Sequence, residues 1–193
     1  IRDVERSRGL GDVYKRQGMK LYVNEYELET NPAKLAKLID FVNYIDQNST
    51  TQVDGIATQM HVRANGITRE QVDQMFQTLA ATGKLVRVSE LDVALGTSSP
   101  TQDDLQLQSD VYQMIVESYK ENVPAEQRGG FVVWTLSDAA DEHEYWLNGD
   151  KPNLFDENYG RKIAYKGLCD GIAGYDIGAD FSGDIWKDPV SYT

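Results

Sequence analysis

Cysteine, histidine and long apolar runs are scarce in this sequence of 193 residues, and each shortage excludes a class of structure. The single cysteine, Cys169, cannot form an internal disulfide, and one thiol does not supply a structural zinc cage. The chain holds no run of about 18 apolar residues, so no membrane-spanning helix is predicted. It does not open with a charged segment followed by an apolar core, so no signal peptide is predicted within it.

Basic residues are also few, with 19 Lys and Arg against 31 Asp and Glu and a net charge of −12. This excess of negative charge disfavours nucleic acid and anionic membranes as partners, whereas neutral polymers are compatible with it. Glycine-rich phosphate loops are absent too, since the sequence contains neither Gly-x-Gly-x-x-Gly after the first predicted strand nor Gly-x-x-x-x-Gly-Lys-Ser/Thr. The sequence therefore contains neither of these motifs for binding the phosphates of a nucleotide.

The sequence divides into three parts of different character. Residues 1–17 hold five basic and three acidic residues without helical or strand periodicity, and they resemble translated adapter sequence. We expect this segment to be a non-native leader. Residues 18–175 carry the regular pattern of one domain, which is short for a complete eightfold barrel of about 250 residues. Residues 176–193 are interpreted as a terminal extension or the start of a linker, because their spaced aspartates do not fit a helix-loop-helix calcium site.

The domain is predicted to alternate strands with helices. Runs rich in β-branched and aromatic residues predict strands at 21–26, 53–61, 85–93 and 130–134. Helix starts are indicated between them by Asn31-Pro32, by a capping box of Thr68 with Gln71, and by Ser99-Pro100. The last of these helices is predicted to bury Leu107, Val111, Met114, Ile115 and Tyr119, and a short amphipathic helix is predicted around 162–169. Alternation in units of roughly 30–40 residues predicts a parallel α/β sheet.

Polar and aromatic side chains gather where these strands end. They are Asn24 and Tyr26, Gln59 and His61, Glu90 and Asp92, and Trp134. Alternate residues of a strand share a face, and the carboxyl ends of parallel strands are where α/β folds bind ligands. Amide, imidazole and carboxylate groups beside a tryptophan ring suit a sugar, whose hydroxyls need polar partners and whose ring has apolar faces.

Other interpretations of these residues stay open at this point. Carboxylates such as Glu90 and Asp92 are usually solvated or salt-bridged, and a lone histidine such as His61 is usually a structural hydrogen-bond donor. A metal site built from these three residues would need a second histidine in most catalytic sites, and the other histidine of the chain is His143. We expect neither a metal nor a cofactor.

Four blocks of sequence, taken in order, resemble the C-terminal half of glycoside hydrolase family 10, the endo-β-1,4-xylanases with a (β/α)8 TIM barrel. The blocks are Leu-Tyr-Val-Asn-Glu-Tyr at 21–26, Val-Asp-Gly-Ile-Ala-Thr-Gln-Met-His at 53–61, Val-Ser-Glu-Leu-Asp-Val at 88–93, and Val-Trp-Thr-Leu-Ser-Asp at 133–138 leading to Tyr145-Trp146 and Asn153-Leu-Phe-Asp156. The resemblance runs from Lys20 to about Gly171 and implies strands five to eight of the barrel.

The resemblance also implies a role for each candidate residue. Glu90 would be the nucleophile of a retaining mechanism, with His61 bonded to it and Asp92 orienting the imidazole. The residues implied in substrate binding are Gln59, Trp134 and Trp146 against the sugar, with Asn24 and Tyr26 supporting the site. Xylan or xylo-oligosaccharides would be the ligand, with secretion or a periplasmic location.

The chain departs from the family pattern in one respect. A retaining glycosidase needs a second carboxyl group as acid and base, and the family carries it in a Trp-x-x-x-Asn-Glu context that is absent here. We therefore expect half a barrel that is inactive alone and self-associates through its open sheet edges. A retaining β-1,4-glucanase and a non-catalytic xylo-oligosaccharide-binding or scaffold protein are the alternatives.

Overall fold

The computed structural model describes residues 18–141 and 146–178. Its elements in chain order are β1 (Tyr22–Glu25), α2 (Pro32–Asn48), β2 (Gly55–Thr58), β3 (His61–Arg63), α3 (Arg69–Ala80), β4 (Leu85–Ala94), α4 (Gln102–Asn122), the 3-10 turn η1 (Ala125–Gln127), β5 (Arg128–Val133) and α5 (Ile163–Ala173). The predicted leader 1–17, His143, Tyr145 and most of the tail, from 179 onward, lie outside the described residues.

The strands form one parallel sheet that is not closed. β1 pairs with β2, β2 with the first half of β4, β3 with the second half of β4, and β5 with the other edge of β4. Within the part of the chain that the structure describes, β1 and β5 each have a neighbour on one side only, so the sheet has two open edges. This arrangement confirms the parallel α/β sheet predicted from the sequence and matches part of a barrel.

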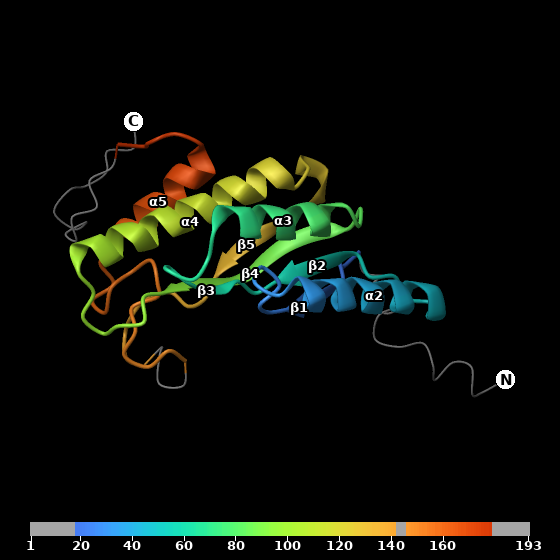
Figure 1. Cartoon of the computed structure of the whole chain (residues 1–193), viewed down its shortest axis with the longest axis horizontal. Helices are drawn as coiled ribbons and strands as arrows, with labels where there is room; N and C mark the ends of the chain where they lie inside the picture. Colours follow the sequence, from blue (N-terminus) through green and yellow to red (C-terminus); the bar gives the residue numbers. More distant parts are fainter. Residues whose placement is uncertain (1–17, 142–145, 179–193) are drawn as a thin grey trace.

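The helices lie along the sheet as the connections between parallel strands. In Figure 1, α3 and α4 run above the strands, α5 packs against α4, and α2 lies beside β1 and β2. The loop between β5 and α5 descends at the opposite end from α2, near β3. The carboxyl ends of the central strands therefore face this loop, which brings the later part of the chain to the end of the sheet where the candidate residues lie.

Local capping explains where the helices begin. The Asn31 side chain accepts a hydrogen bond from the Lys34 amide at 3.0 Å, and Pro32 occupies the first turn of α2. Thr68 and Gln71 form the predicted capping box of α3. The start of α4 was predicted two residues early, because Thr101 rather than Ser99 caps this helix.

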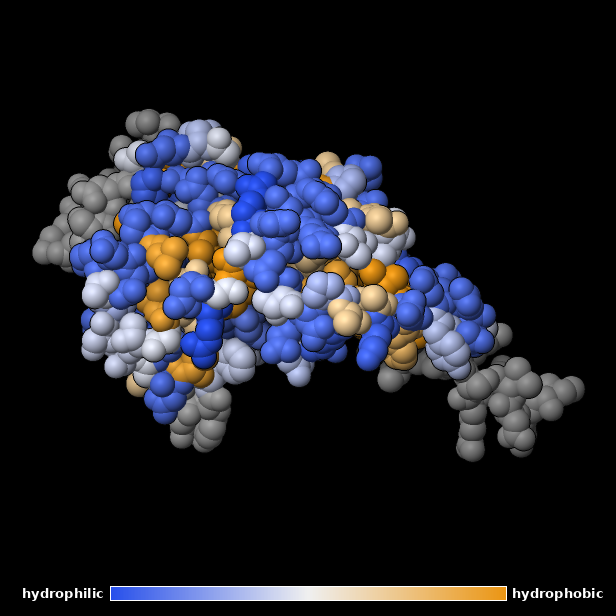
Figure 2. Space-filling view, in the orientation of Figure 1, coloured by the Kyte–Doolittle hydropathy of each residue, from blue (hydrophilic) through white to orange (hydrophobic). Residues whose placement is uncertain are grey.

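The core lies between the sheet and the helices α3 and α4. Its fully buried members include Val72, Phe76 and Leu79 of α3, Val86, Val88 and Leu91 of β4, and Tyr112 and Ile115 of α4. Burial of such a side chain contributes about 1.5–3 kcal/mol to folding. The prediction that α4 buries Leu107 is wrong, since this side chain is 39% exposed. Figure 2 shows hydrophilic side chains over most of the viewed face, with hydrophobic ones gathered in a band across its middle.

The predicted strand 53–61 is also wrong as a single element. It is divided into β2 and β3 at Gln59 and Met60, and Met60 has a φ of 64°, in the left-handed region. The break is matched by an offset in β4, where Val88 pairs with Thr58 but Asp92 pairs with His61. Between these two pairs, residues 89–91 of β4 oppose only residues 59–60, so β4 has one extra residue, which is the signature of a β-bulge.

Candidate active site

A cavity of about 590 Å³ opens at the carboxyl ends of the strands. Most of the predicted site residues line it, namely Tyr26, Gln59, His61, Glu90, Asp92, Trp134 and Trp146. The eighth, Asn24, is hydrogen-bonded to one of them. The structure therefore brings together all eight residues, which lie in β1, β3 and β4, directly beyond the ends of β1, β2 and β5, or in the long loop after β5.

The Glu90 carboxylate is held by two neighbours. Its Oε1 accepts a hydrogen bond from Asn24 Nδ2 at 2.8 Å, and its Oε2 lies 3.5 Å from His61 Nε2. The orientation of the Asn24 amide follows from a third contact, because the Ser89 hydroxyl donates to Asn24 Oδ1 at 2.8 Å. With its oxygen engaged by Ser89, Asn24 presents its nitrogen to Glu90.

The β-bulge explains how Ser89 and Glu90 can both reach Asn24. Successive residues of a regular strand point to opposite faces of the sheet. Here the extra residue of β4 falls between the pairs formed by Val88 and Asp92, so the alternation is interrupted at 89–90. The nucleophile candidate and the serine that orients its amide partner therefore lie on the same face.

His61 connects Glu90 to a buried acid. Its Nδ1 lies 2.8 Å from Asp92 Oδ2, and the indole Nε1 of Trp146 donates to the same oxygen, also at 2.8 Å. Asp92 is completely buried. Burial by itself lowers the pKa of His61, but its hydrogen bond to Asp92 and the charges of Asp92 and Glu90 outweigh burial and raise that pKa. A protonated His61 can donate to both carboxylates.

Two tryptophans surround the imidazole. The ring centroids of His61 and Trp146 lie 4.5 Å apart with a tilt of 53°, and those of His61 and Trp134 lie 6.4 Å apart in an edge-on arrangement at 80°. Trp134 follows β5 directly, and its backbone amide still bonds to Leu91 of β4 at 2.9 Å. The indoles supply the apolar surface on which a sugar ring stacks.

The loop that carries Trp146 is anchored by a buried ion pair. Lys162 Nζ lies 2.8 Å from Asp138 Oδ2, and both side chains are almost fully buried. Burial raises the pKa of Asp138 and lowers the pKa of Lys162, while their mutual attraction opposes both shifts. Asp138 also accepts the backbone amide of Asn153 at 2.9 Å. These contacts attach both ends of the loop to one another.

Tyr26 forms an exposed wall of the cavity. The Lys34 ammonium lies 3.2 Å from the centroid of its ring and also pairs with Glu25 at 3.1 Å. A backbone hydrogen bond from Tyr26 and the pairing with Lys34 lower the pKa of Glu25, against the opposing effect of burial. Glu25 is thereby engaged beside the cavity as a structural ion-pair partner of α2.

Sequence reasoning missed three residues of this site. Arg63 and Glu27 line the cavity, and Ser89 orients Asn24. A signal existed for Arg63, since it lies two residues beyond His61 and so shares its face in β3. Glu27 directly follows Tyr26 at the end of β1, but its φ of 57° takes it out of the strand pattern. Ser89 could not be found, because it reaches the site only through the β-bulge.

Among residues 18–141 and 146–178, no group of three His, Cys, Asp or Glu side chains is arranged to hold a metal ion. His61 contacts both Glu90 and Asp92. In the same part of the chain, none of the helices combines the length and apolar character needed to cross a membrane.

The fold and the site define an incomplete α/β barrel with a carboxylate, histidine and tryptophan cluster at the carboxyl ends of its strands. Comparison with models of protein families identifies the family to which this chain belongs. Residues 14–171 match glycosyl hydrolase family 10, and the chain belongs to this family.

Curated relatives agree with this assignment. The chain is 33% identical over 176 residues to the endo-beta-1,4-xylanase Xyn10C of Cellvibrio japonicus, a match that covers 80% of this chain and 28% of the relative. It is 30% identical over 153 residues to an endo-1,4-beta-xylanase of Agaricus bisporus, covering 79% of this chain and 44% of that relative. The chain thus spans less than half the length of these relatives.

Solved structures show the same fold. A thermostable mutant of the xylanase Xyn10A from Cellvibrio japonicus superimposes with a TM-score of 0.72 at 29% identity, covering 80% of this chain and 50% of the other. Xylanase10C from the same organism, as its E385A mutant in complex with xylopentaose, has a TM-score of 0.74 at 29% identity and covers 85% and 36%. These structures are TIM-barrel xylanases, so the open sheet corresponds to part of such a barrel.

Proposed function

We propose that this chain is the C-terminal half of the catalytic barrel of an endo-β-1,4-xylanase that retains anomeric configuration, with Glu90 as its nucleophile. The observation that carries the proposal is the chain of contacts from Asp92 through His61 to Glu90, completed by Asn24. It positions one carboxylate, by hydrogen-bond donors on two sides, in a cavity that is also lined by tryptophan.

The geometry suits a double-displacement reaction. Glu90 attacks the anomeric carbon of the sugar, the bond to the leaving oxygen breaks, and a covalent glycosyl ester forms. Asn24 donates a hydrogen bond to Glu90 and the imidazole of His61 lies beside its other oxygen, and these two contacts orient the carboxylate for attack. Water then cleaves the ester and restores the carboxylate.

The acid and base carboxyl group of this reaction is assigned to a part of the barrel other than the five strands described here. In a retaining glycosidase that group lies about 5–5.5 Å from the nucleophile. Glu25, which directly follows Asn24 in the sequence, is already engaged with Lys34. The 193-residue chain is therefore proposed to bind xylo-oligosaccharides but not to turn over xylan.

Substrate contacts are assigned by position in the cavity. Gln59 offers an amide to sugar hydroxyls, while Trp134 and Trp146 offer ring faces, and Tyr26 forms the outer wall.

The open edges at β1 and β5 are proposed to mediate self-association of the isolated chain, because the unpaired backbone groups of an edge strand can form hydrogen bonds with a strand of another chain. Action outside the cell is proposed because polymeric xylan does not cross a membrane.

Trapping of the covalent intermediate tests the proposal directly. A xylobioside with a 2-fluoro substituent and a dinitrophenolate leaving group needs no proton donor, so the isolated chain can react with it. Mass spectrometry of the digested protein is expected to find one xylobiosyl adduct, attached to Glu90. Glu90→Gln should carry none, whereas Glu126→Gln, at an exposed acid outside the cavity, should react like the unchanged chain.

The outcome that overturns the assignment is an adduct on another carboxylate, or no adduct at concentrations that saturate the cavity. A second measurement concerns the polymer. The purified chain should release no reducing sugar from xylan, and turnover that survives in Glu90→Gln would refute the role given to this residue.

A further inference from the structure

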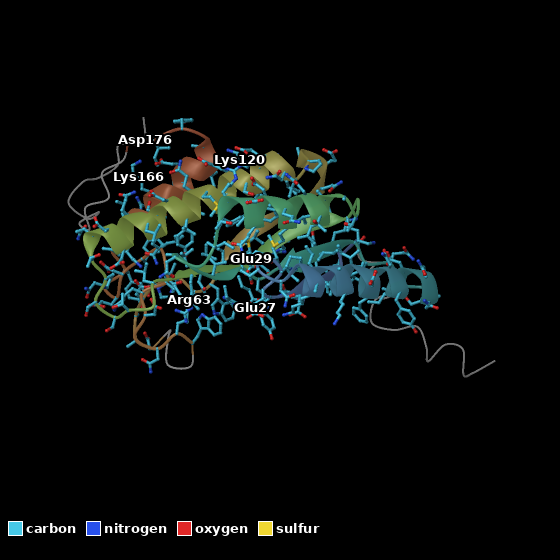
Figure 3. All side chains as sticks on the ribbon, viewed as in Figure 1. Glu27, Glu29, Arg63, Lys120, Lys166 and Asp176 are labelled. Atoms are coloured by element: carbon cyan, nitrogen blue, oxygen red, sulfur yellow. The ribbon has the colours of Figure 1, made fainter. Side chains whose placement is uncertain are left out.

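A second cavity adjoins the first at Arg63. It has a volume of about 390 Å³, and Arg63 and Leu147 line both cavities. The rest of its wall is polar or small, with Thr97, Ser98 and Asn148 among its residues. Figure 3 labels Arg63 and Glu27 on the lower side of the molecule, where the loops beyond the strands gather. The guanidinium thus lies where two recesses meet.

The charge of Arg63 is not used inside the described part of the chain. Its side chain forms no hydrogen bond and no ion pair with any residue of 18–141 or 146–178. In the first cavity the acids on the wall are Glu27, Glu90 and Asp92, while Arg63 is the one Lys or Arg among its described lining residues. A cation that pairs with none of the described residues is unusual in a chain with a net charge of −12, and its positive charge attracts anions.

Asp150, the acid among the described lining residues of the second cavity, already accepts hydrogen bonds. The Asp150 carboxylate accepts the backbone amide of Leu95 at 3.0 Å on one oxygen and that of Gly96 at 2.7 Å on the other. Gly96 has a φ of 76°, and a Cβ there would lie 3.2 Å from Arg63 Nη1. Glycine at this position therefore leaves space beside the guanidinium. The Asp150 carboxylate is already used in binding the backbone amides of residues 95 and 96.

We propose that Arg63 and the second cavity bind the carboxylate of an acidic sugar branch, such as a uronic acid, carried by the xylan chain in the first cavity. This inference rests on the proposed function and adds the substrate class to it. A carboxylate near Glu90 and Asp92 would be repelled, so the branch points toward Arg63. Guanidinium binds carboxylate by two parallel hydrogen bonds, which gives direction as well as attraction.

The test compares two ligands on the 193-residue chain by isothermal titration calorimetry at low salt. One is xylotetraose, and the other is xylotetraose with a single 4-O-methylglucuronic acid branch. The acidic ligand is expected to bind roughly three- to tenfold more tightly, the range of an exposed to partly buried charged hydrogen bond. Added salt should reduce this ratio. Arg63→Gln should bring the ratio to about one, and Arg63→Lys should keep part of it.

Lys37→Gln is the matched control, since it removes one positive charge from an exposed site on α2 and should leave the ratio unchanged. The ratio also separates the two proposals. Binding of both ligands with equal affinity, or a preference that persists in Arg63→Gln, overturns the role of Arg63 while leaving the xylanase proposal intact. Failure of both ligands to bind overturns both proposals.

Discussion

Replacement of Asp92 by asparagine removes the charge at the centre of the site without changing the shape of the side chain. Asp92 is completely buried, and its Oδ2 lies 2.8 Å from both His61 Nδ1 and Trp146 Nε1. A hydrogen bond to a charged group contributes about 1.5–3 kcal/mol. Asparagine can place its carbonyl oxygen where Oδ2 lies, but the hydrogen bonds from His61 and Trp146 then lose the negative charge of their acceptor.

We therefore expect Asp92→Asn to lower the free energy of unfolding by about 2–4 kcal/mol, against a total of roughly 5–15 kcal/mol for a domain. With a denaturant dependence of about 2 kcal/mol per molar urea, the urea midpoint should fall by about 1–2 M. Tryptophan fluorescence measures this transition. The pKa of His61 should fall as well, because burial then acts without the charge of Asp92, and NMR titration of the imidazole measures it.

Asp110→Asn is the control, since Asp110 is exposed on α4 and the same change there should cost less than about 0.5 kcal/mol. The reasoning is refuted if Asp92→Asn and Asp110→Asn have the same urea midpoint. It is also refuted if the pKa of His61 stays raised in Asp92→Asn, because the charge of Asp92 would then not be the cause.

Three further predictions follow from contacts in the fold. The raised pKa of His61 makes its stabilising contribution complete below its unfolded pKa of about 6.5 and lost as pH rises through the folded pKa, so unfolding midpoints should fall with pH more steeply in the unchanged chain than in His61→Gln. Gly167→Ala should cost about 1–3 kcal/mol in urea unfolding, because a Cβ would overlap the Ser109 backbone across the α4–α5 contact. Tyr112→Phe should cost about 1–2 kcal/mol in the same assay, because the carbonyl of Pro152 loses a buried hydrogen bond.

The first of these predictions is tested by comparison with His61→Gln, and the second and third have controls at exposed positions. Equal pH slopes for the unchanged chain and His61→Gln would contradict the first. Ile172→Ala on the outside of α5 should change stability by less than Gly167→Ala, and the reverse order would contradict close packing of α4 against α5. Tyr175→Phe, at a side chain that is 70% exposed, should be neutral beside Tyr112→Phe.

The helices and most of the site could be predicted because their signals are local. A capping box such as Thr68 with Gln71 satisfies backbone amides within one turn, so the sequence alone indicates where α3 begins. The shared face of Glu90 and Asp92 follows from strand periodicity, and the structure brings both into contact with His61. The burial of Leu107 was predicted wrongly, because at this level of α4 the adjacent Gln108 faces the interior instead, fully buried and hydrogen-bonded to the backbone carbonyls of Val93 and Lys151.

By itself, the sequence determined the order of strands and helices and the residues that gather at the strand ends, since both depend on contacts between near neighbours in the chain. Only the tertiary structure decided the one-residue offset of β4 against β2 and β3, which turns Ser89 and Glu90 to the same face. It also decided which charges are compensated, pairing Asp138 with Lys162 and leaving Arg63 between two cavities. Register and charge pairing join residues distant in the sequence, so local propensity carries no information about them.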